Sequence, residues 1–201
     1  MLLPALSSAK ARALKIQCTS QMKQLGLGFG MFVGDRDDML PPAGWSTGNY
    51  QLSWDSWLHR YIGGRASEAD LSVGVLFAGD APKILTCPTD RFPKVNWMGG
   101  TSPWFALRSY AMVAVGANWQ SDYQVPDTAA LPDLSKAGRR GVGIYWTSSS
   151  ATPNWDARGY KTAIVRDPAG TILLCENTTG QQAAANIWTC ICIGPQFASA
   201  N

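Results

Sequence analysis

The N-terminal part of the chain carries one continuous stripe of apolar residues at helical spacing. Successive members are four, four, three, four and three positions apart: Leu14, Cys18, Met22, Leu25, Phe29 and Phe32. Such spacing is typical of an amphipathic helix with one buried face. The polar run 35–38 after Gly34 indicates where the helix ends. We therefore predict a helix over residues 1–36, with this packing stripe buried against the rest of the protein.

The predicted helix is unusually long for a globular protein. Roughly 30 helical residues extend about 45 Å at a rise of about 1.5 Å per residue, which is more than twice the usual length. A helix of this length projects beyond its domain or packs against a partner. Pro4 is tolerated in a first helical turn but would kink a helix that began further upstream.

Beyond this helix the predicted elements are short. Trp54, Trp57, Leu58 and Tyr61 have the spacing of a short helix within 54–63. An Asp-Pro-Ala-Gly turn divides the run 161–177 into two predicted strands. The remaining assignments are a turn at 40–45, strands at 83–90, 109–119 and 186–194, and a loop at 132–141.

The order of these elements predicts an α+β fold. A long helix, residues 1–36, comes first, and a head domain with long loops and an antiparallel β-sheet, residues 37–201, follows. The sequence holds no run of about 20 apolar residues, so no complete transmembrane helix is expected.

Composition narrows the class of protein. The chain has 201 residues, 46% of them hydrophobic, and a net charge of +3 without a dense basic patch. A core is therefore expected and a nucleic-acid partner is not. Charged residues make up only 15%, while tryptophan, glycine and proline are abundant, with 9, 20 and 12 copies. This balance favours a loop-rich, extracytoplasmic domain. The tryptophans are predicted mainly as core and loop anchors, with a carbohydrate-stacking surface as the alternative.

Cysteine and histidine usage argues against a metal or thiol site. His59 is the single histidine. The five cysteines include no C-x-x-C pair: Cys18, Cys87, Cys175, Cys190 and Cys192. A structural zinc site is therefore not expected, and no metal or cofactor is predicted. A thiol nucleophile at Cys87 has no directly adjacent basic residue to lower its pKa, so a structural cysteine is the favoured interpretation.

Other candidate sites also fit structural roles better. Gly26, Gly28 and Gly30 lie late in the helical stripe, whereas a dinucleotide loop requires a strand before its glycines. The acidic run 34–38 lacks the alternating ligands and the closing Glu of a calcium loop. Glu176 follows an apolar run but has no local partner, and the nucleophile-elbow motif G-x-S-x-G is absent. We predict a protein that is not an enzyme, with a hydrolase that uses His59 as an alternative.

Several short motifs resemble those of one bacterial family. Residues 2–6 read LLPAL, Cys18 follows, 22–26 read MKQLG and 35–41 read DRDDMLP. Further on, CPTD at 87–90, SYAM at 109–112 and GTILLCE at 170–176 match more thinly. Together they resemble bacterial prepilin-like proteins, relatives of the type II secretion pseudopilins common in Verrucomicrobia and Planctomycetes. The N-terminal motifs are the most specific, and the resemblance spans most of the chain in pieces.

The resemblance implies a pilin-like fold and a structural role. In that family a long helix packs by its back half on an antiparallel sheet, and its apolar front half is embedded in the inner membrane before assembly. After the leader is cleaved and the new N-terminus is methylated, helices stack in a pseudopilus or type IV pilus-like filament. The expected partners are other pilin-like subunits, and the expected location is the cell envelope, periplasmic or extracellular. Recurrence of Cys18 and Cys87 in the family motifs also implies a disulfide between them.

The chain departs from the family at both ends. The cleavage site and about 18 apolar residues, close to a full membrane span, are missing before Met1, so the chain as written is not expected to insert or to be processed. The family's closing histidine with a later Asp-Gly is also absent. Leu2 and Leu3 are then the tail of the membrane segment. The alternative function is a glycan-binding module of the envelope on the same scaffold.

Overall fold

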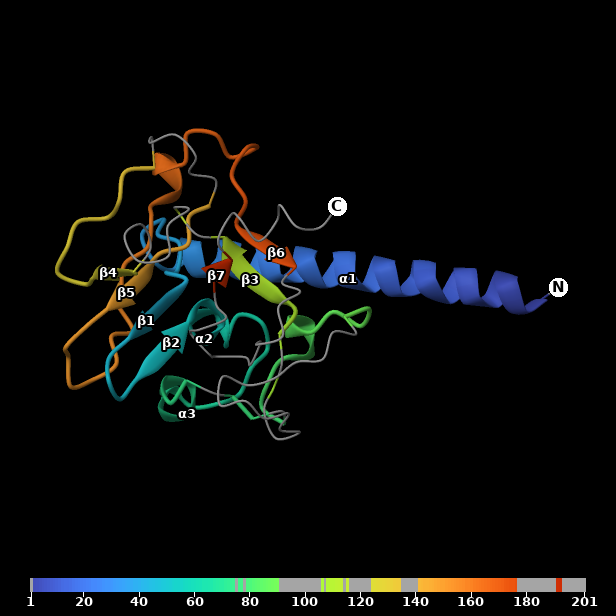
Figure 1. The fold of residues 1–201 in the computed structure, drawn as a ribbon, viewed down its shortest axis with the longest axis horizontal. Helices are drawn as coiled ribbons and strands as arrows, with labels where there is room; N and C mark the ends of the chain where they lie inside the picture. The colour runs from blue at the N-terminus through green and yellow to red at the C-terminus, as the bar shows by residue number, and fades with distance from the viewer. Residues whose placement is uncertain are drawn as a thin grey trace.

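The longest element is the helix α1, which covers 33 residues from Leu2 to Gly34. At about 1.5 Å per residue it extends about 50 Å. The computed structural model describes residues 2–74, 76–77, 79–90, 106, 108–113, 115, 124–134, 141–176 and 191–192. The described residues after Gly34 are called the head below. The C-terminal half of α1 packs against the head, and its N-terminal half runs out beyond it (Figure 1).

One face of α1 is buried where the helix meets the head. Within the packing stripe, Leu25, Phe29, Phe32 and Cys18 are buried, and the other two members, Leu14 and Met22, are half-buried. The helix ends two residues before the predicted position, because Asp37 and Asp38 adopt φ values of 50° and 61°. Aspartate is among the few residues that tolerate this left-handed region. No helix among the described residues is long and apolar enough to cross a membrane.

A four-stranded sheet forms one part of the head, in the order β2-β1-β5-β4. Strand β1 (Gly44–Ser46) pairs antiparallel with β2 (Gln51–Ser53) across a short turn. Strand β5 (Tyr145–Thr147) lies parallel to both β1 and β4 (Gln124–Pro126). Trp45 and Trp146 are partners in the β1–β5 register, and both side chains are fully buried.

A three-stranded sheet forms the second part, in the order β6-β3-β7. The central strand β3 (Tyr110–Val113) is buried along its whole length. It pairs antiparallel with β6 (Leu174–Glu176) and parallel with β7 (Ile191–Cys192). In Figure 1 these strands lie over the C-terminal half of α1.

The observed fold is α+β, with an N-terminal helix and mixed sheets, so the antiparallel sheet predicted from the sequence is wrong. The three parallel pairings join strands that are far apart in the chain, such as 44–46 with 145–147. Turn residues indicate pairing only between neighbouring strands, and therefore the parallel partners left no local signal.

The short helices of the head lie next to these sheets. The helix predicted within 54–63 begins at Trp54 as α2 (Trp54–Leu58) and is followed by turns, with Gly63 at a φ of 84°. A second helix, α3 (Glu68–Ser72), begins at a capping box made by Ser67 and Asp70. The sequence did not predict α3, because a helix of five residues is too short for apolar residues to recur at helical spacing.

Two of the predicted strands are 3-10 helices instead. Within 83–90 the chain forms η1 (Lys83–Leu85), where Pro82 provides the N-cap. The first half of 161–177 forms η2 (Thr162–Ile164), while the second half contains β6 as predicted. Of 109–119, residues 110–113 form β3, and of 186–194, residues 191–192 form β7. Most other positions of those two runs, and 135–140 of the predicted loop, lie outside the described residues.

Candidate functional site

A disulfide fastens the middle of α1 to the head. Cys18 of the packing stripe is bonded to Cys87, which follows η1, and their Cα atoms lie 5.2 Å apart. Both cysteines are buried. The hydroxyl of Thr89 lies 2.9 Å from the sulfur of Cys87 and 3.3 Å from that of Cys18. The pair that the family resemblance implied is therefore bonded in this structure.

Polar contacts continue the junction one turn further along α1. The buried Gln21 side chain donates to the carbonyl of Lys83 at 3.4 Å and accepts from the hydroxyl of Tyr110 at 3.3 Å. Burial, and to a smaller extent the charge of Glu176, raises the pKa of Tyr110 to about 12. The tyrosine therefore stays protonated and able to donate over the physiological range. Gln21 was not among the predicted residues, since a polar side chain interrupts an apolar stripe.

One group of the described residues has metal-ligand atoms close together. A carboxylate oxygen of the exposed Glu176 and the sulfurs of Cys18 and Cys87 all lie within 4.8 Å of one another. Metal ions bind cysteine as the thiolate, and sulfurs that are bonded to each other present none. As long as the disulfide is intact, this cluster is not a metal site.

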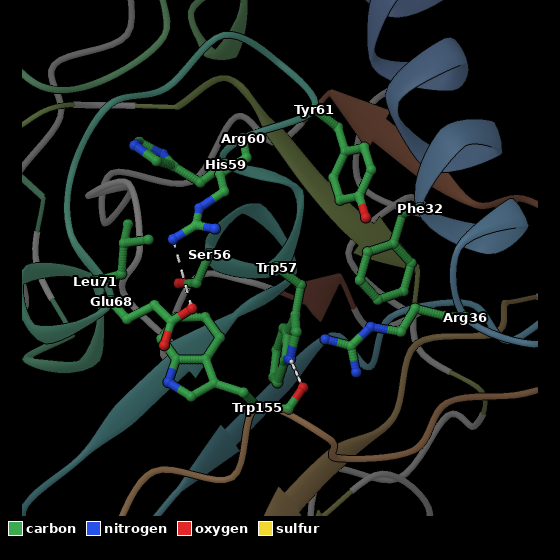
Figure 2. Close-up of a pocket in the computed structure, with 10 residues that line it drawn as sticks. All are labelled: Phe32, Arg36, Ser56, Trp57, His59, Arg60, Tyr61, Glu68, Leu71 and Trp155. Carbon is green, nitrogen blue, oxygen red and sulfur yellow. Dashed lines mark hydrogen bonds and ion pairs between the residues drawn. The ribbon is translucent and has the colours of Figure 1, made fainter.

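A pocket opens on the head at the C-terminal end of α1. Its volume is about 150 Å³. The end of α1, the segment from α2 to the following turn, α3 and the loop at Trp155 contribute the lining, which we call the aromatic pocket (Figure 2): Phe32, Arg36, Ser56, Trp57, His59, Arg60, Tyr61, Glu68, Leu71 and Trp155.

Aromatic rings form the walls of the aromatic pocket in two edge-to-face pairs. The rings of Trp57 and Trp155 have centroids 6.4 Å apart and planes at 74°. Those of Phe32 and Tyr61 are 5.8 Å apart with planes at 79°. The indole N–H of Trp57 donates to the backbone carbonyl of Trp155 at 2.9 Å, so the corner between the two tryptophans is fixed. The edge-to-face geometry of both ring pairs is favourable for the ring quadrupoles.

Paired charges stand around the mouth of the pocket. Arg60 and Glu68 approach to 3.7 Å, and both side chains are largely exposed. On the other side, Arg36 lies over the ring of Phe32 and contacts Asp156 at 2.6 Å. Figure 2 shows Arg60 and Glu68 turned toward each other on one side of the pocket and Arg36 beside Phe32 on the other.

His59 is a buried support of this region. It is 1% exposed, and its Nε2 accepts a hydrogen bond from the backbone N–H of Ala66 at 2.9 Å. Its ring packs on Gly64 so closely that a Cβ there would lie 2.3 Å from ring atoms. Burial lowers the pKa of His59, and the charges of Asp55 and Asp80 oppose this shift in part. The imidazole is therefore neutral at pH 7 and holds the turn between α2 and α3.

Arg108 is a second buried polar residue, besides Gln21, that the sequence did not predict. Its side chain is 0% exposed, forms an ion pair with Asp55 and donates to Ser53 at 3.0 Å. Its guanidinium also lies over the ring of Trp54. A lone arginine between apolar residues gives no pattern in the sequence, so only the fold reveals that it fixes the start of α2.

The remaining predicted candidates have structural surroundings. Asp35, Asp37 and Asp38 are exposed at the end of α1, and Asp35 accepts from the hydroxyl of Tyr61 at 2.9 Å. Of the three glycines, Gly28 packs against Ile62, while a Cβ at the other two would meet nothing within 4 Å. Cys87 is bonded to Cys18 and therefore offers no thiol beside His59. Four of the five described tryptophans are buried, and Trp155 is half-buried.

Comparisons with protein-family models, curated proteins and solved structures give no match to this chain.

Proposed function

We propose that this chain is part of a pilin-like structural subunit of a pseudopilus or type IV pilus-like filament, with no catalytic role. One observation carries the proposal: α1 is 33 residues long and packs against the head along only part of its length. Its N-terminal half places apolar side chains in solvent, with Leu3, Leu6 and Ile16 between 69% and 81% exposed. Apolar side chains gathered along an exposed helix mark an interaction surface, and neighbouring subunit helices are the proposed cover.

The junction supports a mechanical role for the head. A covalent link at Cys18–Cys87 and the contacts of Gln21 hold the head at a fixed place along the helix. Disulfides persist in oxidising compartments, which agrees with a location in the cell envelope, periplasmic or extracellular. In the family that the sequence resembles, the apolar segment in front of this helix anchors the subunit in the inner membrane before assembly. We propose the same anchoring for this protein.

Immunogold labelling of filaments sheared from the producing bacterium tests the proposal. We expect antibodies against the head to label filaments along their length. Replacing Ile16 by Lys in the full-length gene product should remove the protein from the sheared fraction, because a charge is then placed in the helix contact. The membrane fraction should still contain it.

Thr152→Lys is the matched control, because it adds the same charge at an exposed position of the head. It should leave the sheared fraction unchanged. Wild-type protein that never appears in sheared filaments, while the cells express it, contradicts the proposed function.

A further inference from the structure

We propose that the aromatic pocket binds one neutral sugar ring of an envelope or extracellular polysaccharide. The proposal goes beyond the filament role and does not depend on it. A cavity of about 150 Å³ equals the size of one that holds a single benzene molecule. The cavity therefore has room for one six-membered ring, and substituents of that ring can extend through the mouth.

The walls match the apolar faces of a pyranose. A sugar ring presents C–H groups on its faces and hydroxyls at its edge, so it packs on aromatic rings with its polar groups turned outward. The half-buried Trp155 provides such a surface, and Trp57, which is only 5% exposed, packs against it at 74° and holds it in place. Because the Trp57 N–H is held by the carbonyl of Trp155 at 2.9 Å, the corner needs little reordering on binding, and this reduces the entropic cost.

The mouth matches the hydroxyls at the edge of the ring. The exposed pair Arg60 and Glu68, 3.7 Å apart, offers N–H donors and carboxylate acceptors together. The charges cancel within this pair, and Arg36 is likewise balanced by Asp156 at 2.6 Å. A neutral polyol can use both kinds of group, whereas a phosphate or a uronate would meet a carboxylate with each arginine.

A sugar also fits better than an aromatic side chain of a protein partner. An aromatic residue inserted here would cover Arg60 and Glu68 and supply them with no hydrogen bonds. Removing charged groups from water without new partners is costly. The same groups hydrogen-bond a sugar hydroxyl at once, so the lining favours the carbohydrate.

Saturation-transfer NMR on the purified chain, with glucose, galactose, mannose, N-acetylglucosamine and their short oligomers, tests the assignment. We expect transfer to at least one of these sugars. Trp155→Ala should weaken that binding at least about tenfold, or about 1.4 kcal/mol. The hydrogen bond from Trp57 is kept, because it is made to the backbone of Trp155. Glu68→Ala, on the exposed rim, should weaken binding several-fold with no loss of folding.

Ile164→Ala is the control, because it truncates an apolar side chain that is 47% exposed and does not line the pocket. Its sugar binding should equal that of the wild type. Absence of transfer to every neutral sugar overturns the proposal, as does transfer that neither Trp155→Ala nor Glu68→Ala reduces. Tighter binding of glucuronate, or binding of phenylalanine peptides in place of sugars, overturns it in favour of an anionic ligand or a protein partner. None of these results changes filament labelling, so the two proposals fail separately.

Discussion

Removing the link between Cys18 and Cys87 should be the most destabilising single change at the helix–head junction. The two residues are 69 positions apart in the sequence. A cross-link that closes a loop of this length lowers the chain entropy of the unfolded state by an amount worth about 4 kcal/mol at 25 °C. Measured disulfides usually contribute about 2–4 kcal/mol, a large part of the 5–15 kcal/mol that is typical of whole domains. We expect the double variant Cys18→Ala, Cys87→Ala to lose about 2–4 kcal/mol of unfolding free energy.

Urea unfolding followed by tryptophan fluorescence measures this loss. Either single variant should lose nearly as much as the double variant, because one substitution already opens the loop and the two effects are not additive. Wild-type protein in the presence of a reducing agent should behave like the double variant. The control is Cys175→Ala, at a half-buried position in β6. A double variant that loses less than about 1 kcal/mol refutes the entropy argument.

Four other substitutions test the packing of the head and of α1. His59 is buried and neutral in the folded protein, so the unfolded state binds a proton there at a higher pH than the folded state does. Stability should be full above about pH 6.5 and fall as the pH drops from there toward the lowered pKa of His59. The urea midpoint of His59→Gln should fall less over the same pH range. Arg108→Ala leaves the carboxylate of Asp55 buried without its ion pair and should cost about 3–5 kcal/mol in the same assay; a cost below about 1 kcal/mol contradicts the buried pair. Gly28→Ala should lower the thermal midpoint, since its Cβ would lie 2.8 Å from Ile62, whereas Gly26→Ala has open space and should raise it slightly; equal effects would show that Gly28 is not tightly packed.

The sequence predicted the parts of the fold that depend on local periodicity. The stripe from Leu14 to Phe32 indicated α1 because every third or fourth residue must reach the same face, and the buried members of α1 follow it. The helix at Trp54 and the strand at Tyr110 were also found from their patterns. The runs before Cys87 and after Lys161 were misassigned, because short apolar segments fit a 3-10 turn as well as a strand.

The aromatic pocket could not be predicted from the sequence. Phe32, Trp57, Glu68 and Trp155 come from four segments, and each has an ordinary local role. Phe32 belongs to the stripe, Trp57 to a short helix and Trp155 to a loop. Only the fold brings the end of α1, α2, α3 and the loop at Trp155 to one cavity. The number of tryptophans raised a sugar-stacking surface as an alternative, but nothing in the sequence indicated which of them form it.

The position of the disulfide determines where a force applied along α1 would reach the head. Cys18 lies near the middle of α1, where the half of the helix that contacts the head begins. A pull along the exposed half reaches the head first at this covalent bond, before it reaches the packed contacts of Leu25 and Phe29. Such a force would act on a covalent bond, which does not separate one turn at a time. The apolar contacts of the C-terminal half of α1 would then bear less of the force. With the bond reduced, the same force would act on the outermost turn of the packed helix, and the head would detach one turn at a time.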